Sequence, residues 1–71
     1  MITPEMINNW FTYHSPTPNQ TEDYKAIRDA GRKFAEVVLS CTPESADQTT
    51  AIRTIREAVM WANASIACGG K

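Results

Sequence analysis

Three cationic side chains with helical spacing are the residues of this sequence best suited to bind an anion. Lys25, Arg28 and Arg32 are three and four positions apart, so one face of a helix would present all of them. Arginine suits phosphate because its guanidinium donates two parallel hydrogen bonds to two oxygens. The same spacing is also typical of an ordinary solvated helix face, so both interpretations stay open at this point.

Two ring-bearing residues, Tyr13 and His14, lie just upstream of that stripe in a segment rich in proline. An aromatic ring that stacks on a nucleobase contributes about 1–3 kcal/mol. Aromatic residues beside a cationic helix therefore favour a ligand of the nucleotide type. The structural alternative is that Tyr13 packs against Pro16 or Pro18.

A second pair of cations, Arg53 and Arg56, follows later in the chain. Arg53 also has Glu57 four positions on, which is the spacing of an ordinary ion pair along a helix. The pair is a candidate for a further anion site, and its alternative is a surface ion pair.

The sequence contains few of the residue patterns that a catalytic site or a metal site requires. His14 is the only histidine, the two cysteines form no CxxC motif, and no glycine-rich phosphate loop opens a helix. The carboxylates have the spacing of solvated helix faces rather than of a catalytic pair. We therefore predict no catalytic residues, no metal site and no cofactor, so that the protein is not an enzyme.

The charge balance narrows the class of partner. With 7 Lys and Arg against 8 Asp and Glu, the formal net charge is −1. A binder of DNA or RNA polymers usually has a basic footprint, so we expect neither as a partner. No apolar run approaches the ~20 residues that span a bilayer, so we expect no membrane contact. Two cysteines and no signal peptide favour a reducing cytosol.

The elements that must position these residues are two stretches with apolar residues in three-four alternation. The first contains Tyr24, Ile27, Gly31, Phe34, Val38 and Cys41, and the second contains Ile52, Ile55, Val59, Ala62 and Ile66. Such spacing keeps one seam of a helix against a partner helix. The sequence predicts one all-α domain over residues 1–71, with a short helix about 3–12 and an antiparallel hairpin of long helices about 20–41 and 43–68.

The expected helix ends follow from capping residues. Thr3 and Pro4 are typical of a helix start. Thr42 with the proline after it predicts the start of the last helix, and Ser45 offers a second possible start one turn later. Gly31 on the seam would let the partner backbone approach closely. We expect the short first helix to lie across the hairpin and cover part of it, with Trp10 either lining a pocket or capping the hairpin.

The chain is short of core for its size. Below roughly 70–80 residues a single core rarely supplies more than about 3–5 kcal/mol. A disulfide between Cys41 and Cys68 is excluded, because in an antiparallel hairpin these helix ends lie ~30 Å apart. Self-association is the remaining source of burial, and surplus apolar surface around Met60 and Trp61 suits it. Asn63 in that run is either solvent-facing or a register-setting contact between copies.

The sequence resembles the small helical-hairpin domain of phage proteins that inhibit the CBASS and Thoeris defence systems. The similarity covers about residues 11–67. It is carried above all by the run Arg56-Glu57-Ala58-Val59-Met60-Trp61-Ala62-Asn63-Ala64-Ser65-Ile66-Ala67, together with Tyr13-His14-Ser15-Pro16 and Thr42-Pro43.

The resemblance implies a sponge that acts in the cytoplasm of an infected bacterium. Such proteins form homo-oligomers, typically hexamers. They sequester cyclic dinucleotides such as cGAMP, and some also hold cyclic trinucleotides, without cleaving either. The host effectors are then starved of their activating signal. The alternative is an oligomeric helical interaction module with no nucleotide ligand.

The resemblance also implies roles for single residues. Tyr13 matches the family's base-stacking aromatic and Arg28 its phosphate-binding cation, with His14 and Lys25 as supports. The segment from Trp61 to Asn63 would be assembly surface. Arg53 and Arg56 are the candidates for a separate trinucleotide site.

Overall fold

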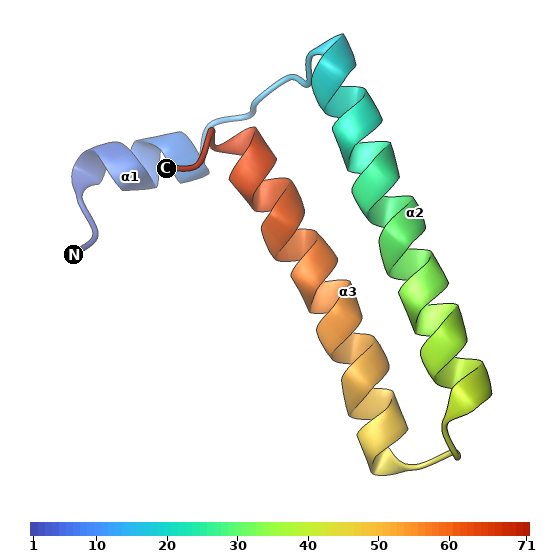
Figure 1. Ribbon diagram of the computed structural model, residues 1–71. Helices are drawn as coiled ribbons and strands as arrows, with labels where there is room; N and C mark the ends of the chain where they lie inside the picture. Colours follow the sequence, from blue (N-terminus) through green and yellow to red (C-terminus); the bar gives the residue numbers. More distant parts are fainter.

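The computed structural model contains three helices, α1 (Pro4–Trp10), α2 (Pro18–Cys41) and α3 (Ala46–Ala67). Helices α2 and α3 run antiparallel side by side, and α1 projects sideways from the end of the hairpin where α3 finishes (Figure 1). The predicted all-α fold, with a short first helix and two long packed helices, is confirmed.

The first two helices begin at threonine caps followed by proline. The Thr3 hydroxyl accepts a backbone N–H from the first turn of α1, and Pro4 is the first helical residue, as predicted. Thr17 and Gln20 form a reciprocal capping box, with the two hydrogen bonds at 3.2 and 3.0 Å. This cap starts α2 at Pro18, slightly earlier than the expected residue 20.

The expected start of the last helix at Thr42 is wrong. Helix α3 begins at Ala46, and Ser45 is its N-cap. The Thr42 hydroxyl donates to the Val38 carbonyl of α2 at 2.6 Å and accepts the Gln48 side-chain amide at 3.1 Å, so its bonds go to the end of α2 and to a side chain, not to the first backbone N–H groups of α3. Ser45 does accept the Gln48 N–H at 3.1 Å, but the Gln48 side chain turns toward the hairpin turn instead of completing a capping box.

Gln48 fastens that turn. Its Nε2 lies 3.3 Å from the Leu39 carbonyl oxygen and 3.1 Å from both the carbonyl and hydroxyl oxygens of Thr42. Gln48 is also the one residue of the chain in the buried class, at 9% exposure. A polar side chain that is buried here is therefore hydrogen-bonded, as the cost of burying an amide requires.

The two long helices pack along a seam with a close approach at Gly31. A Cβ added there would lie 2.5 Å from Cγ2 of Val59, so the glycine makes room on the seam for a side chain of the partner helix, whereas the prediction named the partner backbone. Two predicted seam residues are wrong: Phe34 is 59% exposed and Cys41 is exposed, while Ala35 is half-buried. The physical reason is that a straight helix has about 3.6 residues per turn, so a strict seven-residue repeat drifts off the seam.

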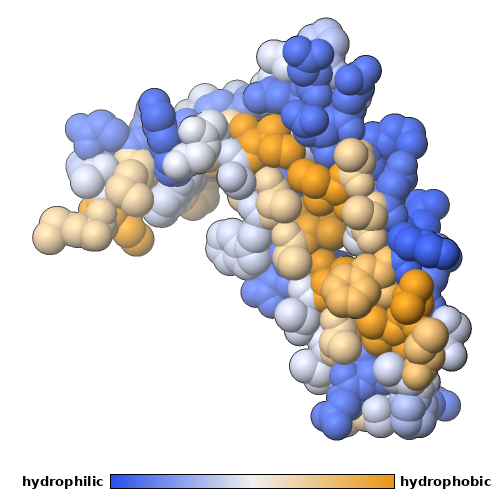
Figure 2. Space-filling view, viewed as in Figure 1, coloured by the Kyte–Doolittle hydropathy of each residue, from blue (hydrophilic) through white to orange (hydrophobic).

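No apolar side chain of the chain is fully buried. Figure 2 shows hydrophobic residues gathered in a band along the hairpin, open to solvent on the side in view. Large apolar side chains that are more than half exposed include Ile2, Phe11, Phe34, Leu39, Met60 and Trp61. Met60 and Trp61 line one hollow together, and contiguous exposed apolar surface of that kind is typical of an interaction surface.

The expectation that α1 covers the hairpin is wrong, since α2 and α3 are the only pair of helices that pack on each other. Instead α1 is attached at the end of the hairpin, beside the chain's C-terminal residues (Figure 1). Cys41 and Cys68 are free thiols at opposite ends of the hairpin. None of the helices has the length and apolar character needed to cross a membrane.

Candidate functional site

A surface hollow of about 500 Å³ lies between the start of α2 and the later part of α3. Two residues of the predicted cationic stripe, Lys25 and Arg28, line it together with residues from the proline-rich linker and from α3. The complete lining is Pro16, Thr21, Glu22, Tyr24, Lys25, Arg28 and Asn63. Arg32, the third cation of the stripe, lies outside this lining.

The two cations of the hollow differ in how free they are. Lys25 forms the one ion pair of the structure, with Nζ 2.6 Å from Oδ2 of Asp29. The hydrogen bond from Lys25 lowers the pKa of the Asp29 carboxyl below its ordinary value. Arg28 is exposed and has no carboxylate partner. Arg28 is therefore the cation of this hollow that an incoming anion would meet unpaired.

Asn63 lines the same hollow. The sequence did not predict that Asn63 would lie beside the cationic stripe. Its Oδ1 is buried and has no hydrogen-bond partner. A buried acceptor without a donor costs about 1–3 kcal/mol, so this atom favours a state in which a donor reaches it. The only sequence signal was an amide within a run of alanines. Met60 and Trp61, with which Asn63 was grouped, line a different hollow on the outer face of α3.

Tyr13 and His14 lie in the linker between α1 and α2. Tyr13 is 84% exposed, and neither residue lines the hollow around Arg28. His14 is half-buried, and its Nε2 lies 2.7 Å from the Asn9 carbonyl oxygen. Because a carbonyl only accepts, the Nε2 atom carries the proton in this hydrogen bond. The structure therefore turns His14 toward α1 and leaves Tyr13 facing solvent.

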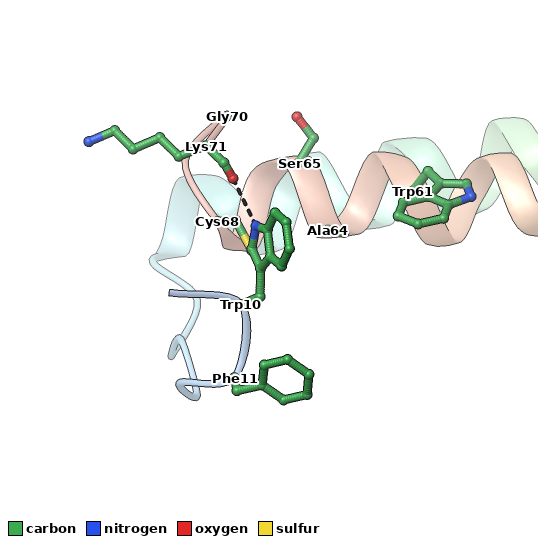
Figure 3. Close-up of a pocket in the computed structure, with 8 residues that line it drawn as sticks. All are labelled: Trp10, Phe11, Trp61, Ala64, Ser65, Cys68, Gly70 and Lys71. Atoms are coloured by element: carbon green, nitrogen blue, oxygen red, sulfur yellow. Dashed lines mark hydrogen bonds between the residues drawn. The ribbon is translucent and has the colours of Figure 1, made fainter. Parts of the chain in front are cut away.

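Aromatic rings line a second hollow, of about 590 Å³, where α1 meets the end of α3 (Figure 3). Its lining is Trp10, Phe11, Trp61, Ala64, Ser65, Cys68, Gly70 and Lys71. Trp10 both lines the hollow and anchors α1, because its Nε1 donates to the Lys71 carbonyl at 3.0 Å. Trp61 is 69% exposed. The exposed rings leave apolar surface uncovered at this end of the molecule.

Arg53 and Arg56 are both exposed on α3, and neither lines a hollow. The alternative of an ion pair between Arg53 and Glu57 is not seen, since the one ion pair joins Lys25 and Asp29. Glu57 instead accepts a hydrogen bond from Nε1 of Trp61 at 3.2 Å. Both arginines are therefore unpaired cations on an open surface.

Within one chain the predicted site residues do not converge on a single pocket. Arg28 and Lys25 share one hollow, Tyr13 stands apart from it, and His14 bonds to α1. No group of three or more His, Cys, Asp or Glu side chains has an arrangement that could hold a metal ion. The arrangement offers an unpaired cation, an exposed ring and uncovered apolar surface at separate places on one chain.

A sequence model of the Acb2/Tad1 hairpin domain matches residues 4–67, which is most of the chain. Neither the curated proteins nor the solved structures gave a match.

Proposed function

The chain belongs to the Acb2/Tad1 hairpin-domain family, and from this premise we propose that it is a phage sponge that sequesters cyclic dinucleotide immune signals. In this proposal the protein binds a ligand such as cGAMP and holds it intact, so that the effectors of CBASS defence are not activated. The ligand is removed by tight binding alone, and no residue acts as a catalyst.

The observation that carries this proposal is the unpaired Arg28 in a hollow that also contains Asn63. A guanidinium without a carboxylate partner is well suited to a phosphate of the ligand. Asn63 lines the same hollow, and a side-chain amide can hydrogen-bond to the edge of a nucleobase. Phosphate and base contacts in one hollow match the two chemical parts of a nucleotide.

Tyr13 supports the same proposal from outside the hollow. Its ring is 84% exposed and so is free to stack on a base. Because Tyr13 and Arg28 do not share a hollow within one chain, we place the ligand where copies of the chain meet, with Lys25 near its phosphates. The uncovered apolar surface, including Met60 and Trp61, would then hold the homo-oligomer together, and we propose a hexamer.

A second site on the same assembly is proposed for cyclic trinucleotides. Arg53 and Arg56 are exposed and unpaired on α3, so symmetry-related copies would bring several such cations together around one ligand. This site is independent of the Arg28 hollow, and a ligand in one need not exclude a ligand in the other.

Calorimetry with a panel of cyclic di- and trinucleotides tests the proposal. We expect a heat of binding with cGAMP and a Kd near 1 nM, which is about −12 kcal/mol. Native mass spectrometry of the same sample should show one oligomer with a fixed number of bound ligands. Denaturing the complex should release intact nucleotide, whereas a cleaved product would identify a phosphodiesterase.

The absence of any fully buried apolar side chain also suits an interaction module with no nucleotide ligand. Such a module predicts assembly without heat from any member of the panel. An oligomer that binds no cyclic nucleotide would therefore overturn the sponge in favour of the module.

A further inference from the structure

The residues on either side of Tyr13 are both hydrogen-bonded back to the last turn of α1. The Thr12 hydroxyl donates to the Asn8 carbonyl, and the His14 imidazole donates to the Asn9 carbonyl. These carbonyls belong to the group that every helix end leaves without intrahelical partners. Tyr13 is thus held between two fastened neighbours, although its own side chain is 84% exposed.

The last turn of α1 is in turn fastened to the far end of the chain. Asn9 Nδ2 donates to the Cys68 carbonyl at 3.1 Å, and Trp10 Nε1 donates to the Lys71 carbonyl at 3.0 Å. Figure 3 shows the Trp10 ring standing over the end of α3 with this bond drawn. Since no helix packs on α1, these bonds and the Trp10 ring fix where α1 lies.

The hydrogen bonds therefore form a continuous path from the end of α3 to the linker. It runs from the Cys68 carbonyl to the Asn9 side chain, and then from the Asn9 carbonyl to the His14 imidazole. Asn9 and His14 are both half-buried, while Tyr13 next to them is not. These bonds thus fasten the backbone that carries the exposed Tyr13 ring.

We propose that Asn9 and His14 are positioning residues that hold Tyr13 in its binding orientation, and that His14 acts through Tyr13 without touching the ligand. This inference rests on the proposed function, because it takes Tyr13 as the base-stacking ring. A ring that is already held in place loses less conformational freedom on binding. Without the bond from His14, Tyr13 spends only part of its time in the competent orientation, and the affinity falls by that fraction.

The test is a matched pair of substitutions at His14, measured with cGAMP. His14→Met has a side chain of similar length but no N–H donor, whereas His14→Gln keeps a donor with similar reach. We expect His14→Met to weaken binding about 5- to 20-fold through the lost competent fraction. His14→Gln should restore affinity to within about 3-fold of the unsubstituted protein. The oligomer mass should be unchanged in both.

A double-mutant cycle separates positioning from direct contact. In a Tyr13→Ala background, a residue that acts only through Tyr13 has nothing left to position, so His14→Met should cause no further loss. Additive losses from the two substitutions would mean that His14 contacts the ligand, and would overturn the inference. An affinity equal to that of the unsubstituted protein for His14→Met would overturn it as well.

A measurement without ligand keeps this inference distinct from the proposed function. NMR relaxation of the Tyr13 backbone amide should show a lower order parameter in His14→Met and in Asn9→Ala than in His14→Gln. An unchanged order parameter would overturn the positioning role of Asn9 and His14, even if the protein binds cGAMP. A lowered order parameter in a protein that binds no cyclic nucleotide would support the positioning role of Asn9 and His14. It would at the same time refute the proposed sequestration of cyclic nucleotides.

Discussion

The two ends of the hairpin differ in whether their side chains find partners within the chain. At the turn, Gln48 is buried and its amide hydrogen-bonds to carbonyls from the end of α2, so this end is complete within one chain. At the opposite end, where α2 begins and α3 ends and which we call the open end, Tyr13 and Trp61 are largely exposed. Asn63 there has a buried acceptor with no donor. The turn end therefore serves the fold. The open end leaves aromatic rings exposed and one buried acceptor without a partner within the chain.

The contrast also separates two kinds of exposed apolar residue. Leu39 near the turn and Met60 on α3 are equally exposed, at 60% and 61%. Met60 belongs to a continuous surface with Trp61 and Ala64, which also reaches the aromatic hollow at the open end. Exposure alone does not mark an interface, and continuity with other apolar groups is the better criterion.

The largest expected effect is on assembly at the open end. Trp61→Ser should cost about 2–4 kcal/mol at each interface, since buried tryptophans are frequent hot spots. Analytical ultracentrifugation at micromolar concentration should show the oligomer replaced by smaller species. Leu39→Ser is the matched control near the turn and should leave the mass unchanged. If Leu39→Ser alone changed the mass, the assembly surface would lie near the turn, and the prediction that it lies around Trp61 would be wrong.

The next effect compares the two cations of one hollow. Arg28→Ala should lose hydrogen bonds to a charged group, about 1.5–3 kcal/mol, and so weaken cGAMP binding about 10- to 150-fold by calorimetry. Lys25 is already paired with Asp29, so Lys25→Ala should change the affinity by less than about 3-fold. The reverse order of the two losses would contradict the assignment of Arg28 as the phosphate-binding cation.

At the turn end, a substitution of Gln48 should lower the free energy of unfolding without changing the affinity for cGAMP. Gln48→Met fills the same space but leaves the Leu39 and Thr42 carbonyls without their donor, which should cost about 1–3 kcal/mol of unfolding free energy. Urea denaturation at fixed protein concentration measures this loss. Affinity for cGAMP below the unfolding transition should stay unchanged. A loss of affinity as large as that of Arg28→Ala would remove the distinction between the two ends.

The smallest effect is expected midway between the ends, at the close approach of the helices. Gly31→Ala brings a Cβ within 2.5 Å of Val59, and such overpacking costs about 1–3 kcal/mol. The alanine also gains about 1 kcal/mol of helix propensity, so the net loss should be about 1 kcal/mol. In a Val59→Ala background the clash is absent, and Gly31→Ala should then stabilise the protein. Denaturation of the four proteins gives this coupling directly.

Much of the fold could be predicted because its signals are local. The cap at Thr3 with Pro4, and the glycine at the centre of the seam, each act through neighbours that spacing alone identifies. Phe34 was assigned wrongly because a repeat of seven drifts along a straight helix. The start of α3 was assigned wrongly because Thr42 and Ser45 are both suitable N-cap residues one turn apart, and the sequence does not rank the two.

The site was less predictable because its components depend on pairing between distant segments. The cationic stripe with Arg28 follows from helix periodicity alone. That Asn63 joins Arg28 depends on the register of α3 against α2, which one amide in an alanine run does not reveal. The attachment of α1 depends on bonds from Asn9 and Trp10 to carbonyls 59 and 61 positions away. No local pattern indicates such bonds.

The anchoring of the turn by Gln48 also sets the order in which the chain gains structure. The acceptors of Gln48 are only 6 and 9 residues away, so this loop closes at small entropic cost. Contacts that are local in sequence form early, and the helices can then zip from the turn toward the open end. The bond from Asn9 to Cys68 joins residues 59 positions apart and closes a much longer loop, so we expect it to form late and to fray early. We therefore expect local opening at α1 under conditions in which the hairpin itself stays folded.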